Sequence, residues 1–427
     1  MVLSYFIFAI LFAFFIALIY KWRFLQLESL NSKWLVFGFS IKFLMGIGLW
    51  FIYTYYYTDR TAADIYKYYD DAIIIFDLTK ENWLLRFQFL SGFVFQDENY
   101  HAVLDQTQHW YRNVSEPFND NPVIIRLNLF ILLFSNGLFH IHTLIFSFLS
   151  FLGSVALFKF IKQFSAISPK VLFAILFLIP SIIFWNSGVL KEAWLFFCLG
   201  FFLLFFQNLM QQFKITHLFA FVVFAFLLFH IKTYILVGLI PGLLFLRLNF
   251  LFNWKNKILA FLILNIGIAI LFLSNYHQKV FEIISQKRND FIQLAIDSNA
   301  RSLVDTSTYH TYKAMLMDLP NAFFTTLFRP GIWEVSGVFT FISSLENVIL
   351  LGILLLPIFY FRKPNPKALT LVLFSLTFVF ILGIVIGLTT PVLGAIVRYK
   401  IPILPFYLIS VLTFVDFKRI PYIQKII

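Results

Sequence analysis

The sequence predicts an all-α protein: a polytopic bundle of about eleven transmembrane helices, with two larger outer loops that carry juxtamembrane helices. Two observations lead to this fold class. Hydrophobic residues make up 60% of the 427-residue chain, only 13% of its residues are charged, and 60 are Phe. Apolar runs of about 17 to 23 residues, long enough to cross the hydrocarbon as helices, recur along the chain. The whole chain, 1–427, is therefore expected to form a single integral membrane domain.

The predicted elements follow in chain order. The first run lacks a basic start and a small-residue cleavage site, so we interpret it as a retained helix with the N-terminus outside. The second run leads into a first outer loop, 56–121, which ends at an amphipathic piece, VIIRLNLFILLF, and a second outer loop is expected at 275–337. The predicted spans are 3–20, 34–55, 140–158, 171–185, 193–209, 217–229, 234–248, 258–274, 338–360, 369–388 and 401–415.

The formal net charge of +12 is explained by its distribution. Basic residues cluster in alternate loops, for example Lys21 with Arg23 and Lys255 with Lys257. This is the positive-inside pattern, so it indicates topology, with the C-terminus in the cytoplasm and a lipid bilayer as the partner. No nucleic-acid motif, zinc spacing or Gly-rich phosphate loop accompanies it.

The acidic segment after the second run, YYYTDRTAADIYKYYDDAIIIFD, is the first candidate site. If it is helical, Asp64, Tyr68 and Asp71 lie at i, i+4 and i+7 and share one face. All but four of the 21 acidic residues fall in the two outer loops, where solvation is the ordinary explanation. Asp64 and Asp71 lie close to the membrane exit of the second span, and we treat them as a candidate catalytic pair.

A second signal is PSIIFWNSGVLKEAW, which predicts a tight outer turn with Gly188 supplying backbone freedom. Lys191 and Glu192 would open the next helix. Glu192 suits the helix dipole there, so capping explains it without a function. Lys191 is disfavoured by the same dipole, which indicates that it meets an anion. Lys232, in HIKTY, repeats the pattern on the same predicted membrane face.

The third cluster is late in the chain: LFRPGIWE with Arg329 and Glu334, and VRYKIP with Arg398 and Lys400. Its basic residues lie on the predicted outer side, against the positive-inside trend. Neutralising the phosphate of a lipid carrier is one explanation. Snorkelling toward headgroups, or pairing with loop acids, is the other.

These segments carry a resemblance. DIYKYYDDA resembles the first outer loop of the GT-C superfamily of glycosyltransferases. PSIIFWNSGVLKE, LFRPGIWE and RYKIPILPF are similar to segments of polytopic proteins found near bacterial envelope-polysaccharide genes. The resemblance implies a protein of the bacterial cytoplasmic (inner) membrane. It would move a sugar from a polyprenyl-phosphate carrier to an acceptor on the periplasmic face, for cell-envelope glycan synthesis.

Carried over residue by residue, the resemblance makes Asp64 the general base that activates an acceptor hydroxyl. Asp71 becomes a supporting acid, or a ligand if a divalent cation is used, and Arg398 or Lys191 a clamp on the phosphate. The chain departs from the family by an extra first helix and by the lack of a large outer domain after the last span. The other predicted substrate- and phosphate-binding residues are Glu192, Lys232, Arg329, Glu334 and Lys400. Aromatic residues that could stack on sugars, or form an interfacial belt, are Tyr66, Tyr69, Trp83, Trp110 and Tyr111.

Three other functions stay open. A polymerase or ligase of lipid-linked polysaccharide repeats would use the same carrier and face. A flippase or transporter should show charged or broken helices near the midplane. The polar groups of this chain gather on one predicted side, which argues against a transporter, but Lys42 and Glu346, both inside predicted spans, keep it open. Glu346 could instead be a neutral or Lys42-paired structural residue. In a structural membrane subunit, the outer charges would carry no catalytic role.

Overall fold

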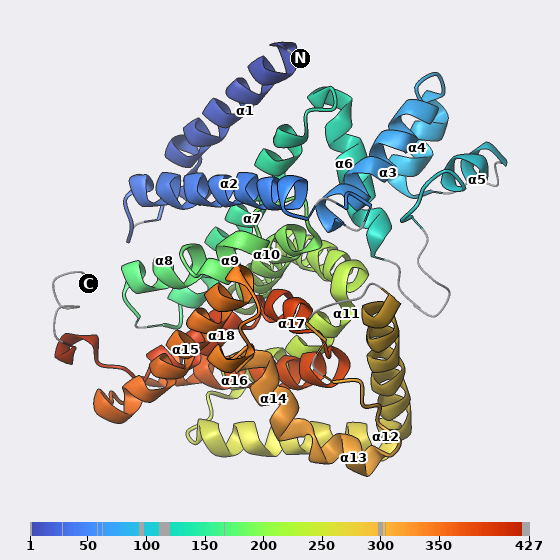
Figure 1. The fold of residues 1–427 in the computed structure, drawn as a ribbon. Coiled ribbons are helices and arrows are strands. Elements are labelled where there is room, and N and C mark those ends of the chain that lie inside the picture. Colours follow the sequence, from blue (N-terminus) through green and yellow to red (C-terminus); the bar gives the residue numbers. More distant parts are fainter. Residues whose placement is uncertain are drawn as a thin grey trace. The chain divides into compact units, whose positions relative to one another are not determined.

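The computed structural model is all-helical (Figure 1). It describes residues 2–27, 29–57, 59–61, 63–93, 98–110, 120–165, 167–297, 302–303 and 305–420. No β-strand occurs in these ranges, which confirms the predicted all-α class. The helices are α1 (Val2–Lys21), η1 (Arg23–Leu25), α2 (Ser32–Tyr55), α3 (Asp64–Leu78), α4 (Trp83–Ser91), α5 (Glu98–Leu104), α6 (Asn121–Ser135), α7 (Phe139–Lys162), α8 (Pro169–Phe177), α9 (Pro180–Trp185), α10 (Lys191–Gln211), α11 (Ile215–Phe252), α12 (Lys257–Asp297), α13 (Tyr312–Met317), α14 (Leu319–Phe328), η2 (Ile332–Glu334), α15 (Val338–Phe359), α16 (Pro366–Thr389), α17 (Leu393–Tyr399), α18 (Leu404–Leu412) and η3 (Phe417–Arg419).

Seven helices of the described ranges are long and apolar enough to cross a membrane: α1, α2, α7, α10, α11, α15 and α16. Two bent pairs raise the number to nine if each is one span. One is formed by the two parts of α12, which meet at 74°, and the other by α17 and α18, which meet at 66°. The chain is therefore a multi-pass membrane protein, and the expected eleven spans are not confirmed.

The difference from eleven has two local causes. The predicted span 171–185 is divided into α8 and α9, because Pro180 lacks the N–H that would continue the helix. The predicted spans 217–229 and 234–248 both lie within α11, whose backbone is non-helical at Lys232, with φ −152° and ψ 84°. An unbroken helix of this length would measure about 57 Å, nearly twice the hydrocarbon thickness.

The chain divides into two compact units. Unit 1 comprises Met1–Lys159 and Ile183–Thr233, and unit 2 comprises Phe160–Ile182 and Tyr234–Ile427. Each predicted outer loop contains helices. The loop 56–121 holds α3, α4 and α5 in unit 1, and the loop 275–337 holds the second part of α12, α13, α14 and η2 in unit 2.

In unit 1, the helices of the predicted first outer loop pack on α6. Helix α3 lies along α6, and α4 also contacts it (Figure 1). Their apolar faces form a common core that includes Ile75, Phe89 and Ile125. Arg126 of α6 donates from Nε to the Phe89 carbonyl at 2.9 Å, which ties α6 to the end of α4. The described helices α3 and α4 of the predicted first outer loop are thus packed on a helix rather than extended.

The backbones of α7 and α10 meet at two glycines in unit 1. A Cβ on Gly200 would lie 2.1 Å from the Gly153 carbonyl oxygen, and a Cβ on Gly153 would lie 2.3 Å from the Phe196 carbonyl oxygen. Small residues at such a crossing let membrane helices approach closely enough for their backbones to pack.

Gly200→Ala is therefore expected to destabilise the protein by about 1–3 kcal/mol, because the added methyl group forces the two backbones apart. Gly48→Ala is the control, since no heavy atom lies within 4 Å of a Cβ there. Alanine in that helix is expected to stabilise by roughly 0.5–1 kcal/mol. The free energy of unfolding of both variants, measured in one detergent, is expected to fall for Gly200→Ala and to rise for Gly48→Ala. Equal stability of the two variants would contradict the close contact of α7 and α10.

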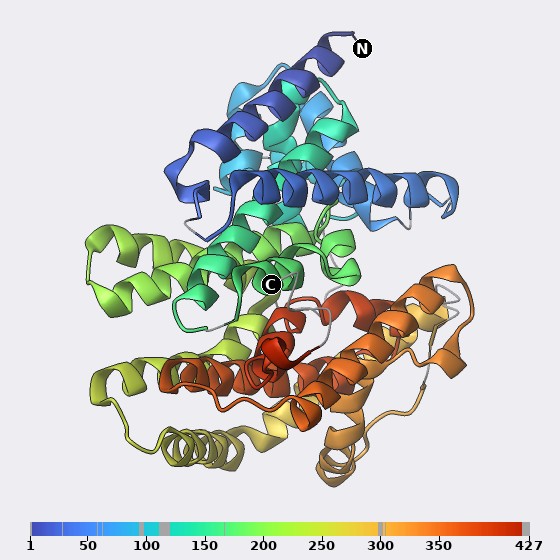
Figure 2. The same ribbon diagram turned by 90° about the vertical axis from the view of Figure 1, so that its left-hand side faces the viewer.

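In unit 2, α16 is the central helix and packs against α14 and α18 (Figures 1 and 2). A Cβ on Gly387 of α16 would lie 2.0 Å from the Ala322 carbonyl oxygen of α14. Thr326 of α14 donates its hydroxyl to the Gly383 carbonyl at 2.7 Å. The side of α16 that faces α14 therefore carries glycines that let the two backbones approach closely, as at the crossing of α7 and α10.

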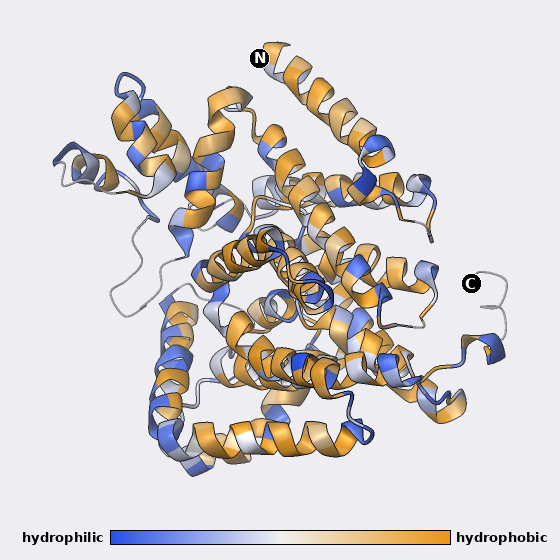
Figure 3. Cartoon of the chain, turned by 180° about the vertical axis from the view of Figure 1, so that it is seen from behind, coloured by the Kyte–Doolittle hydropathy of each residue, from blue (hydrophilic) through white to orange (hydrophobic). Residues whose placement is uncertain are grey.

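Helix α12 changes character at its bend. The part Lys257–Phe272 is almost uniformly apolar, whereas the part Ser274–Asp297 alternates charged and apolar residues (Figure 3). The first part matches the predicted span 258–274. The second part has the composition of a helix that lies at a membrane surface rather than across it.

Candidate functional site

The predicted site residues fall into two groups, one in each unit. Unit 1 contains Asp64, Asp71, Lys191, Glu192 and Lys232. Unit 2 contains the remaining four, namely Arg329, Glu334, Arg398 and Lys400.

Asp64 is the first residue of α3, so the helix that the sequence argument required is present. A carboxylate in the first turn interacts favourably with the helix dipole. The Asp64 side chain is 30% exposed, and Lys67 Nζ lies 3.2 Å from its Oδ1. Asp64 is thus a partly solvated carboxylate with a cation one helical turn away.

Asp71 lies two turns further along α3 but in a different environment. It is 1% exposed, and its carboxylate accepts the backbone N–H groups of Gln108 at 3.0 Å and His109 at 2.8 Å. Burial raises the pKa of Asp71, and the backbone N–H groups act in the opposite direction. The carboxylate therefore holds the segment after α5 in place. No group of three or more potential metal ligands is found in the described ranges.

Lys191 opens α10, as predicted, and it does meet an anion. Its Nζ donates to Asp120 Oδ1 at 2.6 Å and to Asn121 Oδ1 at 2.7 Å, and it lies 5.2 Å from the centre of the Tyr68 ring. The Lys191 side chain is only 4% exposed. The anion is thus a buried protein carboxylate, which neutralises the cation that was predicted to clamp a phosphate.

The turn before α10 does not use Gly188 in the predicted way. Its φ is outside the left-handed region, where Gly92 and Gly137 are found. Instead, a Cβ at Gly188 would lie 2.3 Å from Leu49 Cδ2. Gly188 thus packs closely against the Leu49 side chain of α2 instead of supplying a left-handed backbone.

Glu192 and Lys232 form the second pair of unit 1. Lys232 Nζ lies 3.4 Å from Glu192 Oε1, and both side chains are buried. The pair joins α10 to the point where the backbone of α11 loses its helical geometry. Lys191, Glu192 and Lys232 therefore belong to two buried ion pairs at the start of α10, in which the opposite charges compensate each other.

Asn121 connects these charges to Asp71. Its Oδ1 accepts from Lys191, while its Nδ2 donates to the His109 carbonyl at 2.7 Å. The backbone of His109 is thus held at its N–H by Asp71 and at its carbonyl by Asn121. A continuous polar network leads from α3 through His109 to α10.

Most of the aromatic residues proposed for sugar stacking are not available for it. Tyr66, Tyr69 and Trp110 are each at most 5% exposed. The Tyr69 hydroxyl donates to the Gly137 carbonyl. Trp83 is 61% exposed. Tyr111 lies outside the described residues.

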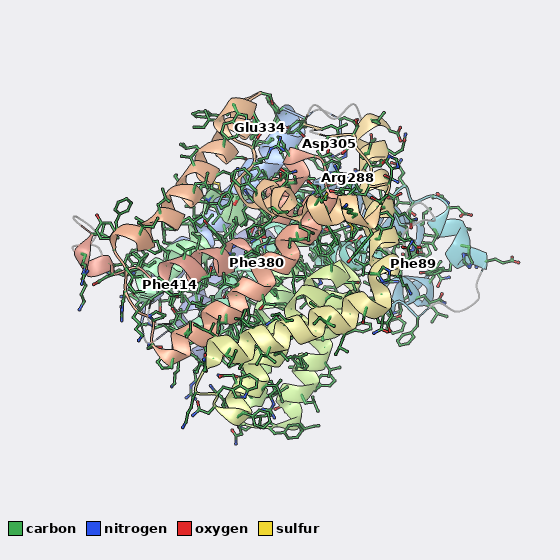
Figure 4. The ribbon with its side chains drawn as sticks, turned by 90° about the horizontal axis from the view of Figure 1, so that it is seen from below. Phe89, Arg288, Asp305, Glu334, Phe380 and Phe414 are labelled. Carbon is green, nitrogen blue, oxygen red and sulfur yellow. The ribbon has the colours of Figure 1, made fainter. Side chains whose placement is uncertain are left out.

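In unit 2, Arg329 and Glu334 pair with each other. Arg329 Nε lies 3.0 Å and 3.1 Å from the two carboxylate oxygens, and Gly331 N–H donates to Glu334 Oε2 at 2.8 Å. The pair closes the short loop between α14 and α15. A separate ion pair joins Arg288 of α12 to Asp305 at 2.8 Å (Figure 4).

The Arg329 guanidinium holds the pKa of Glu334 below its usual 4.5. Because the folded state binds this proton less tightly than the unfolded chain, the stabilisation is fully present above about pH 4.5. It is lost as the pH falls through the lower folded-state pKa. Glu334→Gln is expected to cost about 1 kcal/mol at pH 7, with the difference from wild type vanishing in acid. Unfolding curves of both proteins across this range test it; a constant difference down to pH 3 would contradict it.

Lys400 lies at the bend between α17 and α18 and is buried. Its Nζ donates to the Leu327 carbonyl at 3.1 Å and to Asn347 Oδ1 at 2.5 Å. Asn347 Nδ2 in turn donates to the Pro330 carbonyl at 2.9 Å. The two late sequence motifs are therefore joined to each other through α15. Arg398 lies in the last turn of α17.

The two ionisable residues inside predicted spans have partners within their own units. In unit 1, Lys42 is buried in α2 and donates to Ser150 Oγ at 2.9 Å. In unit 2, Glu346 of α15 accepts from the backbone N–H of Ser181 at 2.8 Å and from its hydroxyl at 2.6 Å. Each polar group is thus hydrogen-bonded inside a helix bundle, which offsets part of the cost of its burial.

Comparison with family models, curated proteins and solved structures finds no match to the chain. The arguments for function therefore rest on the residues themselves.

Sequence reasoning missed three residues of the unit 1 network: His109, Asp120 and Asn121. Asp120 and Asn121 immediately precede Pro122, and this pattern marks the start of α6. That signal could have identified a helix N-terminus, although not its contact with Lys191. His109 has no distinguishing sequence context.

Proposed function

We propose that the protein is a glycosyltransferase of the bacterial cytoplasmic membrane, with its N-terminus outside and its C-terminus in the cytoplasm. It would move a sugar from a polyprenyl-phosphate carrier to an acceptor hydroxyl at the outer face. The observation that carries the proposal is the difference between the two predicted catalytic carboxylates. Asp71 is buried and bonded to backbone N–H groups, whereas Asp64 is 30% exposed.

Glycosyl transfer from a lipid phosphate needs a base for the acceptor hydroxyl and positive charge near the departing phosphate. Asp64 supplies a carboxylate at the start of α3, nine residues after the end of α2. Lys67, 28% exposed and 3.2 Å from Asp64, supplies a cation that can reach a phosphate. Lys191 and Lys232 are compensated by Asp120 and Glu192, so their proposed role is to hold this region together.

The test is sugar transfer by the purified protein in lipid vesicles that contain a labelled polyprenyl-phosphate sugar and a candidate acceptor. The expected result is labelled acceptor, together with release of the carrier phosphate. If the protein instead lengthens lipid-linked repeats, the polymerase alternative replaces this proposal. Failure to transfer sugar from any lipid-phosphate donor would overturn both.

A specific observation favours a second candidate, a transporter of lipid-linked glycans. The backbone of α11 is interrupted at Lys232, and Lys400 lies at the 66° bend between α17 and α18. Discontinuous helices with polar groups at the break are typical of transporter binding sites. Movement of a fluorescent lipid-linked glycan across the vesicle bilayer, without covalent change, would distinguish a transporter from a transferase.

A further inference from the structure

The main chain of His109 is held by hydrogen bonds at both its N–H and its carbonyl. It lies after the end of α5 and before the start of α6. Its N–H donates to Asp71 Oδ2 at 2.8 Å, and its carbonyl accepts from Asn121 Nδ2 at 2.7 Å. Asn121 is itself held by Lys191 at 2.7 Å. Two side chains from different helices thus fix the backbone of this half-buried histidine.

The imidazole is free to accept a proton. Among the described residues, neither of its ring nitrogens has a hydrogen-bond partner. The charged groups that act on the ring come from α3, and they are Asp71, Lys67, Asp64 and Asp70. Burial lowers the pKa of His109 below its usual 6.5, and the three carboxylates act in the opposite direction. The ring is therefore neutral at pH 7, in surroundings that stabilise it once it is protonated.

We propose that His109 is the group that takes the proton from the acceptor hydroxyl, and that the carboxylates of α3, with Asp71 foremost, stabilise the resulting imidazolium. This inference rests on the proposed glycosyl transfer and names the proton acceptor of that same site. It also gives Asp71 a role as a positioning residue, because its buried carboxylate holds the His109 backbone.

The step balances as follows. The acceptor oxygen forms its bond to the anomeric carbon of the sugar while its proton moves to an imidazole nitrogen of His109. The bond between the anomeric carbon and the phosphate oxygen breaks, and its electron pair leaves with the lipid phosphate. The imidazolium then releases the proton to water. A neutral imidazole that accepts a proton next to carboxylates is a common catalytic arrangement.

The test compares the pH dependence of kcat for wild type, His109→Gln and His109→Ala in lipid vesicles. Both backbone hydrogen bonds of His109 are made by main-chain atoms, so these variants are expected to retain them; unchanged unfolding temperatures check this. His109→Gln is expected to lower kcat about 10²–10⁴-fold. Added imidazole is expected to restore part of the activity of His109→Ala, which a merely structural role would not allow.

The acid limb of the wild-type profile separates the possibilities. An acid limb with its midpoint below 6.5 that disappears in His109→Gln supports the inference. An acid limb retained in an active His109→Gln shows that another group takes the proton. That outcome overturns the role of His109 and leaves the transferase standing. A wild-type protein that transfers no sugar overturns both the role of His109 and the proposed transferase function.

Discussion

Lys191→Met is expected to destabilise the protein by about 3–5 kcal/mol, because removing one partner of a buried ion pair leaves the other uncompensated. Lys191 holds both Asp120, at 2.6 Å, and Asn121, at 2.7 Å. Both side chains of the ion pair are nearly inaccessible to water. Methionine is similar to lysine in length, so the loss reflects charge and hydrogen bonding more than volume. Chemical or thermal unfolding in one detergent measures the change.

Two further variants make the Lys191 prediction specific. In Asp120→Asn/Lys191→Met the buried carboxylate is also neutralised, so this double variant is expected to recover part of the lost stability. Lys67→Met is the matched control for the loss of a lysine, since its pair with Asp64 is partly exposed. Its expected cost is about 0.2–1 kcal/mol. Equal losses for Lys191→Met and Lys67→Met would contradict the buried network.

Asp64→Asn is expected to lower kcat for sugar transfer by about 10²–10⁴-fold, with little change in unfolding temperature. The substitution keeps the shape of the side chain and removes its negative charge. Its pair with Lys67 is partly exposed, so its contribution to stability is small. Turnover at saturating donor and acceptor measures kcat apart from binding.

Asp77→Asn is the matched control for Asp64→Asn. Asp77 is an exposed carboxylate near the other end of α3, so this variant removes the same charge from the same helix. It is expected to retain wild-type turnover. Full activity of Asp64→Asn would exclude that carboxylate from the chemistry. Equal losses in the two variants would point to the net charge of α3 rather than to a site.

Several helices could be predicted closely from the sequence. The predicted span 34–55 corresponds to α2 (Ser32–Tyr55), and 369–388 corresponds to α16 (Pro366–Thr389). The prediction that Lys191 opens a helix was also confirmed. These features depend on a continuous apolar run and on local helix signals, and both are properties of neighbouring residues. The count of eleven spans was not confirmed: Pro180 divides the predicted span 171–185 into two short helices, and the predicted spans 217–229 and 234–248 lie in one element that is interrupted at Lys232.

By itself, the sequence determined the class of the protein, because composition and run length decide whether a chain is stable in water or in a bilayer. Only the tertiary structure decided which charged side chains are neutralised or hydrogen-bonded by other residues of the protein. Lys191 finds its carboxylate 71 positions away, and Asp71 binds backbone groups 37 and 38 positions away. Burial and pairing depend on how distant segments pack, and a single sequence carries no local signal for them. For that reason Asp64 and Asp71 look alike in the sequence and differ in the fold.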